Sequence, residues 1–511
     1  LQININEIEI NRSKINFEKS RLSDVVKTEI YAGKKSEVIS LENGANNLAT
    51  NNARQIYSQV SGLNIYQDDA GLQLNIGGRG LDPNRTANFN TRQNGYDISA
   101  DALGYPESYY TPAPEGVKQI QIVRGAASLQ YGTQFGGLLN FIMKSPNQDK
   151  KINIINRNTL GSNSLYTNFT SLSINKKKLG YYGFLNYKEG DGFRENSEFS
   201  SRNFYNHISY TFNKKTKIST EITCFNYLAR QAGGLTDEMF LENPLQSTRE
   251  RNWFKVNWIL YNSNLYHSLN ENTKLSLNLY GLSAFRYALG FRTNRSDQPD
   301  ILKERDLIKS RFNNIASEVR ILKNHKLLTK RAIGLIGAKI YKSNNKSQQG
   351  PGSSASIPDF EFYTNEYPYY NNQSDYKLPN FNTAVFGEEI VYITDKVSII
   401  PGFRYEYIKT EAIGDYTQIN IDGAGNPIWD TIIHEEKERI RDFLLFGCGI
   451  VYKLNSKNQI YTNLTQNYKS ITFSDISIVN PAFMVDENIA DEKGYTLDVG
   501  FRGKNNKILS Y

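Results

Sequence analysis

Residues that could carry out catalysis or bind a metal are few and scattered in this sequence. The histidines and cysteines lie far apart along the chain, without the spacing of a metal-ligand set. They are His207, His267, His325, His434, Cys224 and Cys448. No nucleophile elbow or phosphate loop is present, and "NIGGRG" (75–80) differs from a G-x-G-x-x-G fingerprint. We therefore expect no enzyme, no metal site and no resident cofactor, and we look instead for recognition by charged and aromatic side chains.

The composition is polar on average but rich in aromatic residues. The 511 residues have a mean hydropathy of −0.55 and include 34 tyrosines and 26 phenylalanines. No apolar run is long enough for a membrane-spanning helix. Alternating strands with aromatic girdles give such a composition, and so does an array of soluble β-sandwiches. The formal net charge is +8, and because Lys and Asn gather at apparent turns, we favour solvated turns over a nucleic-acid-binding patch.

Residues 36–148 combine helical and strand patterns with an unusual number of glycines. The stretch at 49–62 has helical spacing, and Asn94-Gly95 is a strong hairpin-turn signal. The segment "VRGAASLQYGTQFGGLLNF" (123–141) suits neither an amphipathic helix nor a plain strand. Its glycines are Gly125, Gly132, Gly136 and Gly137. They predict tight turns and close approach of the backbone to a surrounding wall in a small α+β domain.

From residue 149 onward the chain reads as one strand after another, joined by connections of two kinds. Short Asn/Lys turns are expected at 175–178, 213–216, 270–273, 323–326, 394–396, 455–458 and 504–506. Longer polar segments are expected at 188–201, 228–250, 288–306, 343–380, 410–440 and 468–493. Strict alternation of short and long connections is typical of an outer-membrane barrel, and a sandwich has no reason to sort its loops in this way.

The strands themselves alternate between apolar and polar side chains. In "YTLDVGF" (495–501) the four apolar residues share one face and the polar residues share the other. An apolar face suits lipid, and a polar face suits water or an enclosed domain. Cys224 and Cys448 fall on apolar faces, so we interpret them as lipid-facing spacers. We count fourteen strands and the start of a fifteenth; the barrel either closes near fourteen strands or is truncated, and the lone last strand favours truncation.

At this point the chain resembles a TonB-dependent outer-membrane receptor. The resemblance rests on "NIGGRG", "RQNGYDI", "VKQIQIVRGAASLQYG" and "GGLLNFIMK", in the order of a plug domain, and on "DEKGYTLDVGFRG" in the barrel. It implies an all-β transmembrane barrel of the 22-stranded type with an N-terminal α+β plug, in the bacterial outer membrane. It also implies energy-coupled uptake of scarce ligands through TonB. The expected division is the end of a preceding module at 1–21, a TonB-box linker at 22–35, a plug at 36–148 and a partial barrel at 149–511.

The resemblance assigns roles to individual residues. The segment "SDVVKT" takes the position of the TonB box, where strand addition to TonB is expected, with a plain linker strand as the alternative. Its residues are Ser23, Asp24, Val25, Val26, Lys27 and Thr28. Arginines of the plug are expected to pair with barrel carboxylates, because buried arginines need such partners. The expected anchors are Arg79, Arg124, Glu406, Glu492 and Asp498.

The ligand is expected at the outward apex of the plug and on the upper barrel wall. The candidates are Tyr105, Glu107, Tyr109, Tyr110, Arg286 and Arg292, with Arg230 and Arg295 as further loop or lumen arginines. Arginines there would attract an anionic chelate by charge, although each could equally be an ordinary loop residue.

The segments "IYAGKK" and "RGLDPNRTANFN" look most like the ferric-dicitrate receptor branch, which implies a ferric chelate that carries its own iron. A carboxylate at Glu107 departs from the glutamines of that branch. A passive plugged diffusion channel and TonB-dependent uptake of a non-iron nutrient remain alternatives, and an enzyme or adhesin on a β scaffold has the weakest support.

Overall fold

The described residues of the computed structural model are 21–42, 47–49, 56–57, 60, 62–68, 73–78, 80–124, 128–132, 134–147, 150–293, 295–424, 426–473, 489–505 and 509–510. Arg79, Gly125, most of the expected helix at 49–62 and all but Arg21 of the module expected at 1–21 lie outside them. Among the described residues, no helix is both long and apolar enough to cross a membrane.

Two small sheets and a few short helices form the N-terminal domain. Its five-stranded sheet has the order β3-β8-β9-β6-β7, and a separate hairpin pairs β4 with β5. The elements are β3 (Ser36–Ser40), β4 (Leu63–Asp68), β5 (Gln73–Gly78), η2 (Asn84–Thr86), β6 (Asn90–Gln93), β7 (Tyr96–Asp97), η3 (Pro114–Gly116), β8 (Val117–Val123), α2 (Ser128–Tyr131) and β9 (Leu138–Met143). Ahead of them, β1 (Val25–Val26) and β2 (Glu29–Ile30) form a hairpin whose strands have two residues each.

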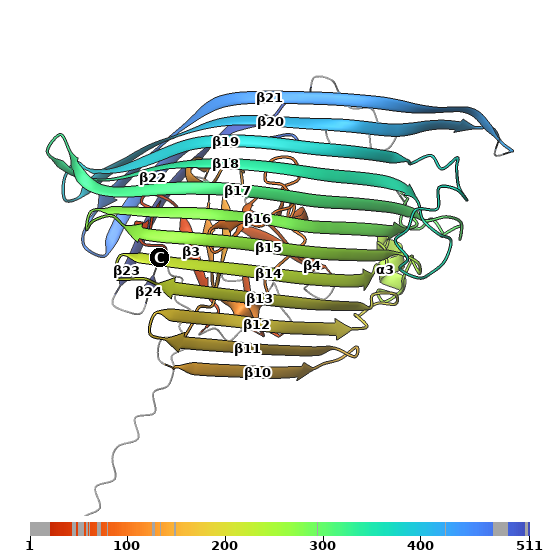
Figure 1. The fold of residues 1–511 in the computed structure, drawn as a ribbon, viewed down its shortest axis with the longest axis horizontal. Coiled ribbons are helices and arrows are strands. Elements are labelled where there is room, and N and C mark those ends of the chain that lie inside the picture. Colours follow the sequence, from red (N-terminus) through yellow and green to blue (C-terminus); the bar gives the residue numbers. More distant parts are fainter. Residues whose placement is uncertain are drawn as a thin grey trace, which may run out of the picture.

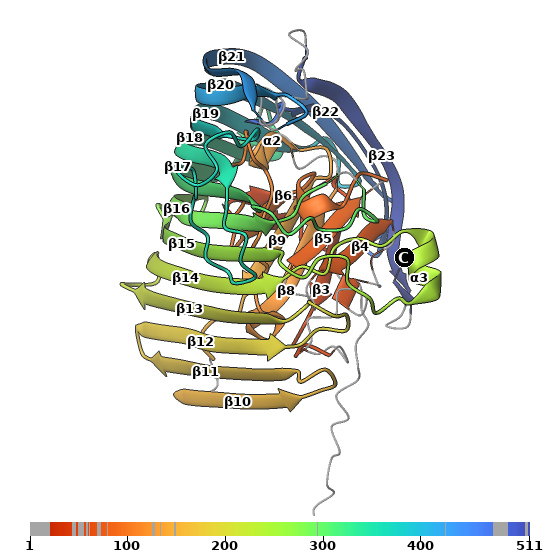
Figure 2. The ribbon, with the colours of Figure 1, turned by 90° about the vertical axis from the view of Figure 1, so that its right-hand side faces the viewer.

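The remainder of the chain forms a 15-stranded sheet in which each strand pairs with its sequence neighbours, all antiparallel (Figure 1). The strands are β10 (Ile152–Leu160), β11 (Tyr166–Lys176), β12 (Leu179–Gly190), β13 (Phe199–Thr211), β14 (Thr216–Arg230), β15 (Trp253–Ser268), β16 (Thr273–Gly290), β17 (Asp306–Leu327), β18 (Lys330–Pro351), β19 (Ser374–Tyr392), β20 (Val397–Ile421), β21 (Pro427–Lys453), β22 (Asn458–Lys469), β23 (Glu492–Asn505) and β24 (Leu509–Ser510). The short helix α3 (Asp237–Glu242) lies in a connection between strands. The sheet curves around the N-terminal domain, which lies on its concave side (Figure 2).

The connections divide the barrel into two ends, as the sequence predicts. We call the end with short turns, such as 177–178 and 328–329, the turn end, and the end with long connections, such as 352–373, the outer end. Two predictions of loop position are wrong. The turn expected at 323–326 lies inside β17, and the long loop expected at 410–440 is mostly strand, because β20 and β21 continue to a connection at 422–426.

The mistake at 410–440 has a physical cause. The stretch "HEEKERIRD" (434–442) carries charges on both faces, which excludes a strand in contact with lipid. Beyond the apolar belt both faces of a strand meet water, so charged residues are tolerated there. In Figure 1 the β20–β21 hairpin extends past the neighbouring strands at the outer end.

The two faces of the large sheet differ as expected. On β23, Tyr495, Leu497 and Val499 are 64–73% exposed on the outward face, whereas Thr496 on the inward face is 8% exposed. Cys448 is exposed and Cys224 is intermediate in burial, and both are free thiols. The outward face is therefore the apolar one.

The inward face is more apolar than the alternation in the sequence predicts. Across β11–β17 it carries aromatic side chains that pack with the plug in one continuous core. Phe169 and Phe184 lie with ring centroids 5.2 Å apart, and Trp258 donates its indole N–H to the carbonyl of Ile98 in the plug. Burial of these rings holds the plug against the wall by the hydrophobic effect.

Two glycine signals of the sequence have clear structural reasons. Asn94 (φ 47°) and Gly95 (φ 91°) join β6 to β7 with positive φ at both positions, as a two-residue hairpin requires. Gly137 (φ 99°) lies so close to Val123 that a Cβ would overlap its carbonyl. Gly137 therefore serves packing inside the plug, whereas Gly132 faces Arg404 and Glu406 of the barrel wall, and Gly116 lies against the ring of Phe184.

Candidate functional site

The outer end of the plug carries a cluster of aromatic and charged side chains. Arg286, near the outer end of β16, donates from Nη2 to the hydroxyl of Tyr105 at 2.9 Å. The Tyr109 hydroxyl donates to Glu107 at 2.7 Å, and Arg85 forms an ion pair with the same carboxylate at 3.0 Å. Both arginines also lie over the Tyr109 ring, at 4.9 Å for Arg85 and 5.7 Å for Arg286. We call Arg85, Tyr105, Glu107, Tyr109 and Arg286 the apical cluster.

Burial distinguishes the members of the apical cluster. Tyr109 is fully buried between Phe254 and Trp258, and burial raises its pKa well above its ordinary value. It therefore remains neutral and supports the others, whereas Tyr105 and Glu107 are partly exposed. The Nε of Arg286 is a buried donor with no hydrogen-bond partner among the described residues. An acceptor on a bound molecule would satisfy it.

The other expected ligand residues lie outside this cluster. Tyr110 is buried and points to Gln93, to which its hydroxyl donates at 3.1 Å. Arg292 is exposed and pairs with Asp306 at 3.1 Å. Arg230 and Arg295 likewise pair with carboxylates, of Glu198 and Asp297. Arg286, in contrast, forms no ion pair with any described carboxylate.

A buried aspartate fixes the loop that carries Tyr105. Asp101 is completely buried and accepts hydrogen bonds from the backbone N–H groups of residues 103 and 104, both at 3.0 Å. It also accepts from Asn345 at 2.8 Å, from Asn380 at 2.9 Å and from Ser343 of the barrel wall. An isolated bridge pairs Asp101 with Tyr105. The wall of β18 and β19 therefore positions Tyr105 through Asp101.

At the opposite, turn end, residues 25–28 of the expected TonB box form β1 and the turn of the β1–β2 hairpin, which we call the coupling hairpin (25–30). Val25 pairs with Ile30 and Val26 with Glu29, and Lys27 has a positive φ of 53° at the turn. Thr28 is buried, and its hydroxyl lies 2.8 Å from that of Ser276 on β16. Ile30 packs in an apolar cluster with Leu322, Ile333 and other wall residues at the turn end. The segment is therefore docked against the wall.

A polar network ties the coupling hairpin to both plug and barrel. Lys34 pairs with Glu388 of β19 at 2.6 Å, and both side chains are 2% exposed. The Gln130 side chain of α2 accepts from the N–H of Ile30 at 3.2 Å, and donates to its carbonyl at 2.5 Å and to Glu388 at 3.1 Å. Arg320 of β17 pairs with Glu29 at 3.7 Å and donates to the Gln130 carbonyl at 3.2 Å. We call Glu29, Lys34, Gln130, Arg320 and Glu388 the latch network.

Of the expected anchors, Arg124 is buried and pairs with Glu37 of the plug at 3.3 Å. Glu406 is buried and pairs with Arg404 of its own strand at 2.6 Å; Arg404 in turn donates to the plug carbonyl of Leu129 at 3.1 Å. The structure does not bring Arg124 and Glu406 together: Arg124 meets a plug carboxylate, and Glu406 accepts hydrogen bonds from Arg404 and Asn382 of the wall. Their role as anchors stays a prediction.

The last two expected anchors lie on β23. Glu492 is mostly exposed and pairs with Lys469 of the neighbouring strand at 3.2 Å. Its pairing within the wall does not support an anchoring role. Asp498 lies on the inward face, opposite Asn463 of β22.

Sequence reasoning missed the latch network and Asp101. One signal was available: Glu318 and Arg320 occupy inward positions two residues apart on β17, as Arg404 and Glu406 do on β20. Opposite charges at i and i+2 on an inward strand face indicate a buried ionic site. Arg320 binds Glu318 at 2.7 Å, and Arg92 of the plug approaches the same carboxylate at 3.8 Å. No local pattern marks Lys34, Gln130 or Asp101.

A plug held inside a curved antiparallel wall, with a docked hairpin at one end and a charged cluster at the other, is the architecture of a plugged outer-membrane transporter. The chain matches the TonB-dependent Receptor Plug Domain over residues 33–138 and the family described as "TonB dependent receptor-like, beta-barrel" over residues 180–510. It therefore belongs to the TonB-dependent receptor family, whose members are transporters of the bacterial outer membrane and not enzymes.

Solved structures of receptors share this fold. The chain is similar to the ferric citrate transporter FecA in its unliganded form (TM-score 0.74, 17% identity, covering 92% of this chain and 68% of that one). It is also similar to the ferric yersiniabactin uptake receptor FyuA from Yersinia pestis (TM-score 0.71, 14% identity, covering 93% of this chain and 70% of that one). A third similar structure is the copper transporter OprC (TM-score 0.65, 13% identity, covering 94% of this chain and 71% of that one). Identities this low show the fold alone. A search of curated proteins found no match.

Proposed function

We propose that this TonB-dependent transporter takes up an anionic ferric chelate, either a ferric siderophore or ferric citrate. The observation that carries the proposal is Arg286, which forms no ion pair with any described carboxylate and whose buried Nε lacks a hydrogen-bond partner. A carboxylate or other anionic oxygen of a chelate would complete its hydrogen bonding. Iron as the metal rests on the likeness to FecA and on the resemblance of the plug segments.

Glu107 does not argue against an anionic ligand. Its carboxylate pairs with Arg85 at 3.0 Å and accepts from Tyr109 at 2.7 Å. The apical cluster therefore combines two guanidinium charges with one carboxylate and remains net positive. A positive cluster between low-dielectric aromatic walls attracts anions more strongly than an exposed one.

We propose further that residues 23–28 are the segment that binds TonB, by adding a strand to it. Val25 and Val26 already have strand pairing in the coupling hairpin, but their partners are Ile30 and Glu29 of the same chain. Strand addition to TonB would therefore require the hairpin to open, and the latch network is what opposes this opening.

The test is binding and uptake by the full chain. Ferric citrate and a ferric siderophore are titrated while the tryptophan fluorescence, to which Trp258 beside Tyr109 contributes, is recorded; the iron-free chelators and a copper complex serve as controls. We expect saturable quenching by an iron-loaded anionic chelate, and radiolabelled iron uptake that is lost in cells lacking TonB. Equal binding of the copper complex or of iron-free nutrients would favour another ligand class, and uptake without TonB would contradict the coupling.

A further inference from the structure

Three cations form a continuous row on the outward face of the large sheet. Arg311 of β17 is directly opposite Lys346 of β18, and Lys346 is directly opposite Lys377 of β19. Arg311 and Lys377 are exposed, and the Lys346 side chain is 37% exposed. We call Arg311, Lys346 and Lys377 the basic row.

This arrangement opposes folding unless an anion binds. Like charges directly opposite each other on neighbouring strands are destabilising. Lys346 pairs with Asp375 at 3.0 Å, and Arg311 donates to the hydroxyl of Tyr287 at 3.2 Å. Among the described residues, neither Arg311 nor Lys377 forms an ion pair, so the basic row retains a net positive charge.

The depth of the basic row along the barrel identifies what it faces. Below it on β17, Asn313 comes first, and three of the four outward positions from Ile315 to Ile321 are apolar, Ser317 being the exception; the next outward residue is Lys323. Six residues at a strand rise of about 3.3 Å span about 20 Å, close to the apolar band of about 25 Å in outer-membrane barrels. Arg311 lies four residues beyond Ile315, about 13 Å along the strand, so the basic row lies outside the apolar belt, at the level of the lipid head groups.

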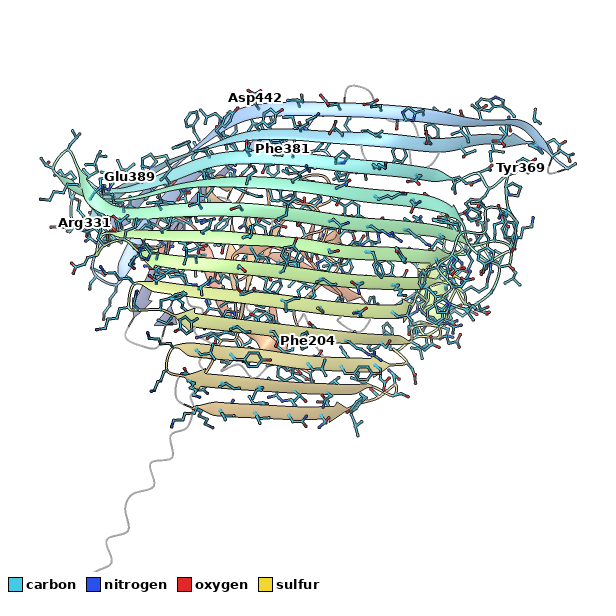
Figure 3. The ribbon with its side chains drawn as sticks, in the orientation of Figure 1. Phe204, Arg331, Tyr369, Phe381, Glu389 and Asp442 are labelled. Carbon is cyan, nitrogen blue, oxygen red and sulfur yellow. The ribbon has the colours of Figure 1, made fainter. Side chains whose placement is uncertain are left out.

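Aromatic rings accompany the basic row, as at a membrane interface. Phe285 is opposite Arg311 and stacks on Tyr287 with ring centroids 4.4 Å apart. Phe381, labelled in Figure 3, lies two outward positions below the row on β19, opposite Lys342 and Lys409. Aromatic and long cationic side chains at this depth suit the boundary between acyl chains and polar head groups.

We propose that the basic row binds the phosphate groups of an anionic lipid in the outer leaflet. The Arg311 guanidinium can bind phosphate through two N–H groups, and the two lysines add point charges beside it. The surface faces the bilayer, so a lipid occupies it, and the phosphates neutralise a row that no protein carboxylate neutralises completely. This interaction is independent of the ligand that the apical cluster binds.

The test compares lipid binding by the purified full chain in neutral detergent micelles. The probes are lipid A carrying its phosphates and the same lipid without phosphates, titrated against the wild type and the R311Q/K346Q/K377Q variant. The charge-matched control is K323Q/K326Q/K330Q, three exposed lysines at the turn end. If each cation contributes a factor of about five to the affinity, the R311Q/K346Q/K377Q variant should bind phosphorylated lipid A about a hundredfold more weakly. The control should bind like the wild type.

Unfolding temperatures in the same micelles separate binding from folding. Without lipid, the R311Q/K346Q/K377Q variant should unfold at or above the wild-type temperature, because a repulsive row has been removed. Phosphorylated lipid A should raise the unfolding temperature of the wild type and leave the unfolding temperature of the variant unchanged. Equal lipid binding by the variant, equal loss in the control, or displacement of the lipid by millimolar inorganic phosphate would each overturn the proposal.

Discussion

At the scale of single residues, the partner of each arginine indicates its task. Arg251 and Arg305 are buried among loop carbonyls and carboxylates, which makes them braces of the outer connections. Arg292 has Asp306. Arg286 instead donates to the hydroxyl of Tyr105, and its Nε has no hydrogen-bond partner among the described residues. Charge alone does not distinguish these arginines in the sequence; the location of the carboxylates does.

Replacing Arg286 by glutamine should weaken binding of an anionic chelate by roughly ten- to a hundredfold, the usual size of a hydrogen bond to a charged group. The measurement is the dissociation constant from quenching of the tryptophan fluorescence. Arg295→Gln, in an exposed ion pair with Asp297, is the matched control and should bind normally. Unchanged affinity in Arg286→Gln would remove Arg286 from the ligand site.

At the scale of elements, the proposed binding of TonB requires the coupling hairpin to open. It is short, and two residues per strand contribute little pairing by themselves. Its docking depends instead on side chains: Thr28 to Ser276, Glu29 to Arg320, and the Ile30 backbone to Gln130. These contacts connect the segment simultaneously to wall and plug, so a pull on it acts on both.

A disulfide between Thr28→Cys and Ser276→Cys should lock the coupling hairpin, because the two hydroxyl oxygens are 2.8 Å apart. With Cys224 and Cys448 replaced by serine, we expect the oxidised protein to bind ligand normally and to lose TonB-dependent uptake. Reduction should restore uptake, and each single cysteine variant should transport. Transport by the oxidised double variant would show that the hairpin need not be released.

Replacing Lys34 by methionine should loosen the coupling hairpin. The change leaves the buried Glu388 without its cation, which typically costs about 3–5 kcal/mol. We expect faster tryptic cleavage after Lys27, the exposed residue at the hairpin turn, and slower cleavage again in K34M/E388L, where the uncompensated carboxylate is absent. Identical cleavage in all three proteins would exclude the latch network as the restraint.

At the scale of the whole molecule, the plug is held in two different ways. Polar contacts concentrate on α2 and the latch network, whereas aromatic packing dominates across β11–β17. Polar contacts exchange readily with water, while separating an apolar interface exposes its whole area at once. We therefore expect the segments near the latch network to move before those on the aromatic wall.

The aromatic wall can be tested at Gly116, which is packed against the Phe184 ring. Gly116→Leu should push the plug from the wall, and Phe184→Ala should leave a cavity costing about 3–5 kcal/mol. The double variant should be destabilised by less than the sum of the two, because the leucine fills the space of the ring. Thermal unfolding in detergent measures this coupling, and strictly additive effects would contradict the packing.

The sequence by itself determined the strand wall, its apolar outward face, the two kinds of connection and the Asn94-Gly95 hairpin. Each depends on backbone geometry over a few residues, which a local pattern records. Only the tertiary structure decided that Lys34 meets Glu388, that Asp101 holds the apical loop, and that Arg311, Lys346 and Lys377 align across three strands. Those pairs lie far apart in the chain, and strand register together with the seating of the plug brings them together.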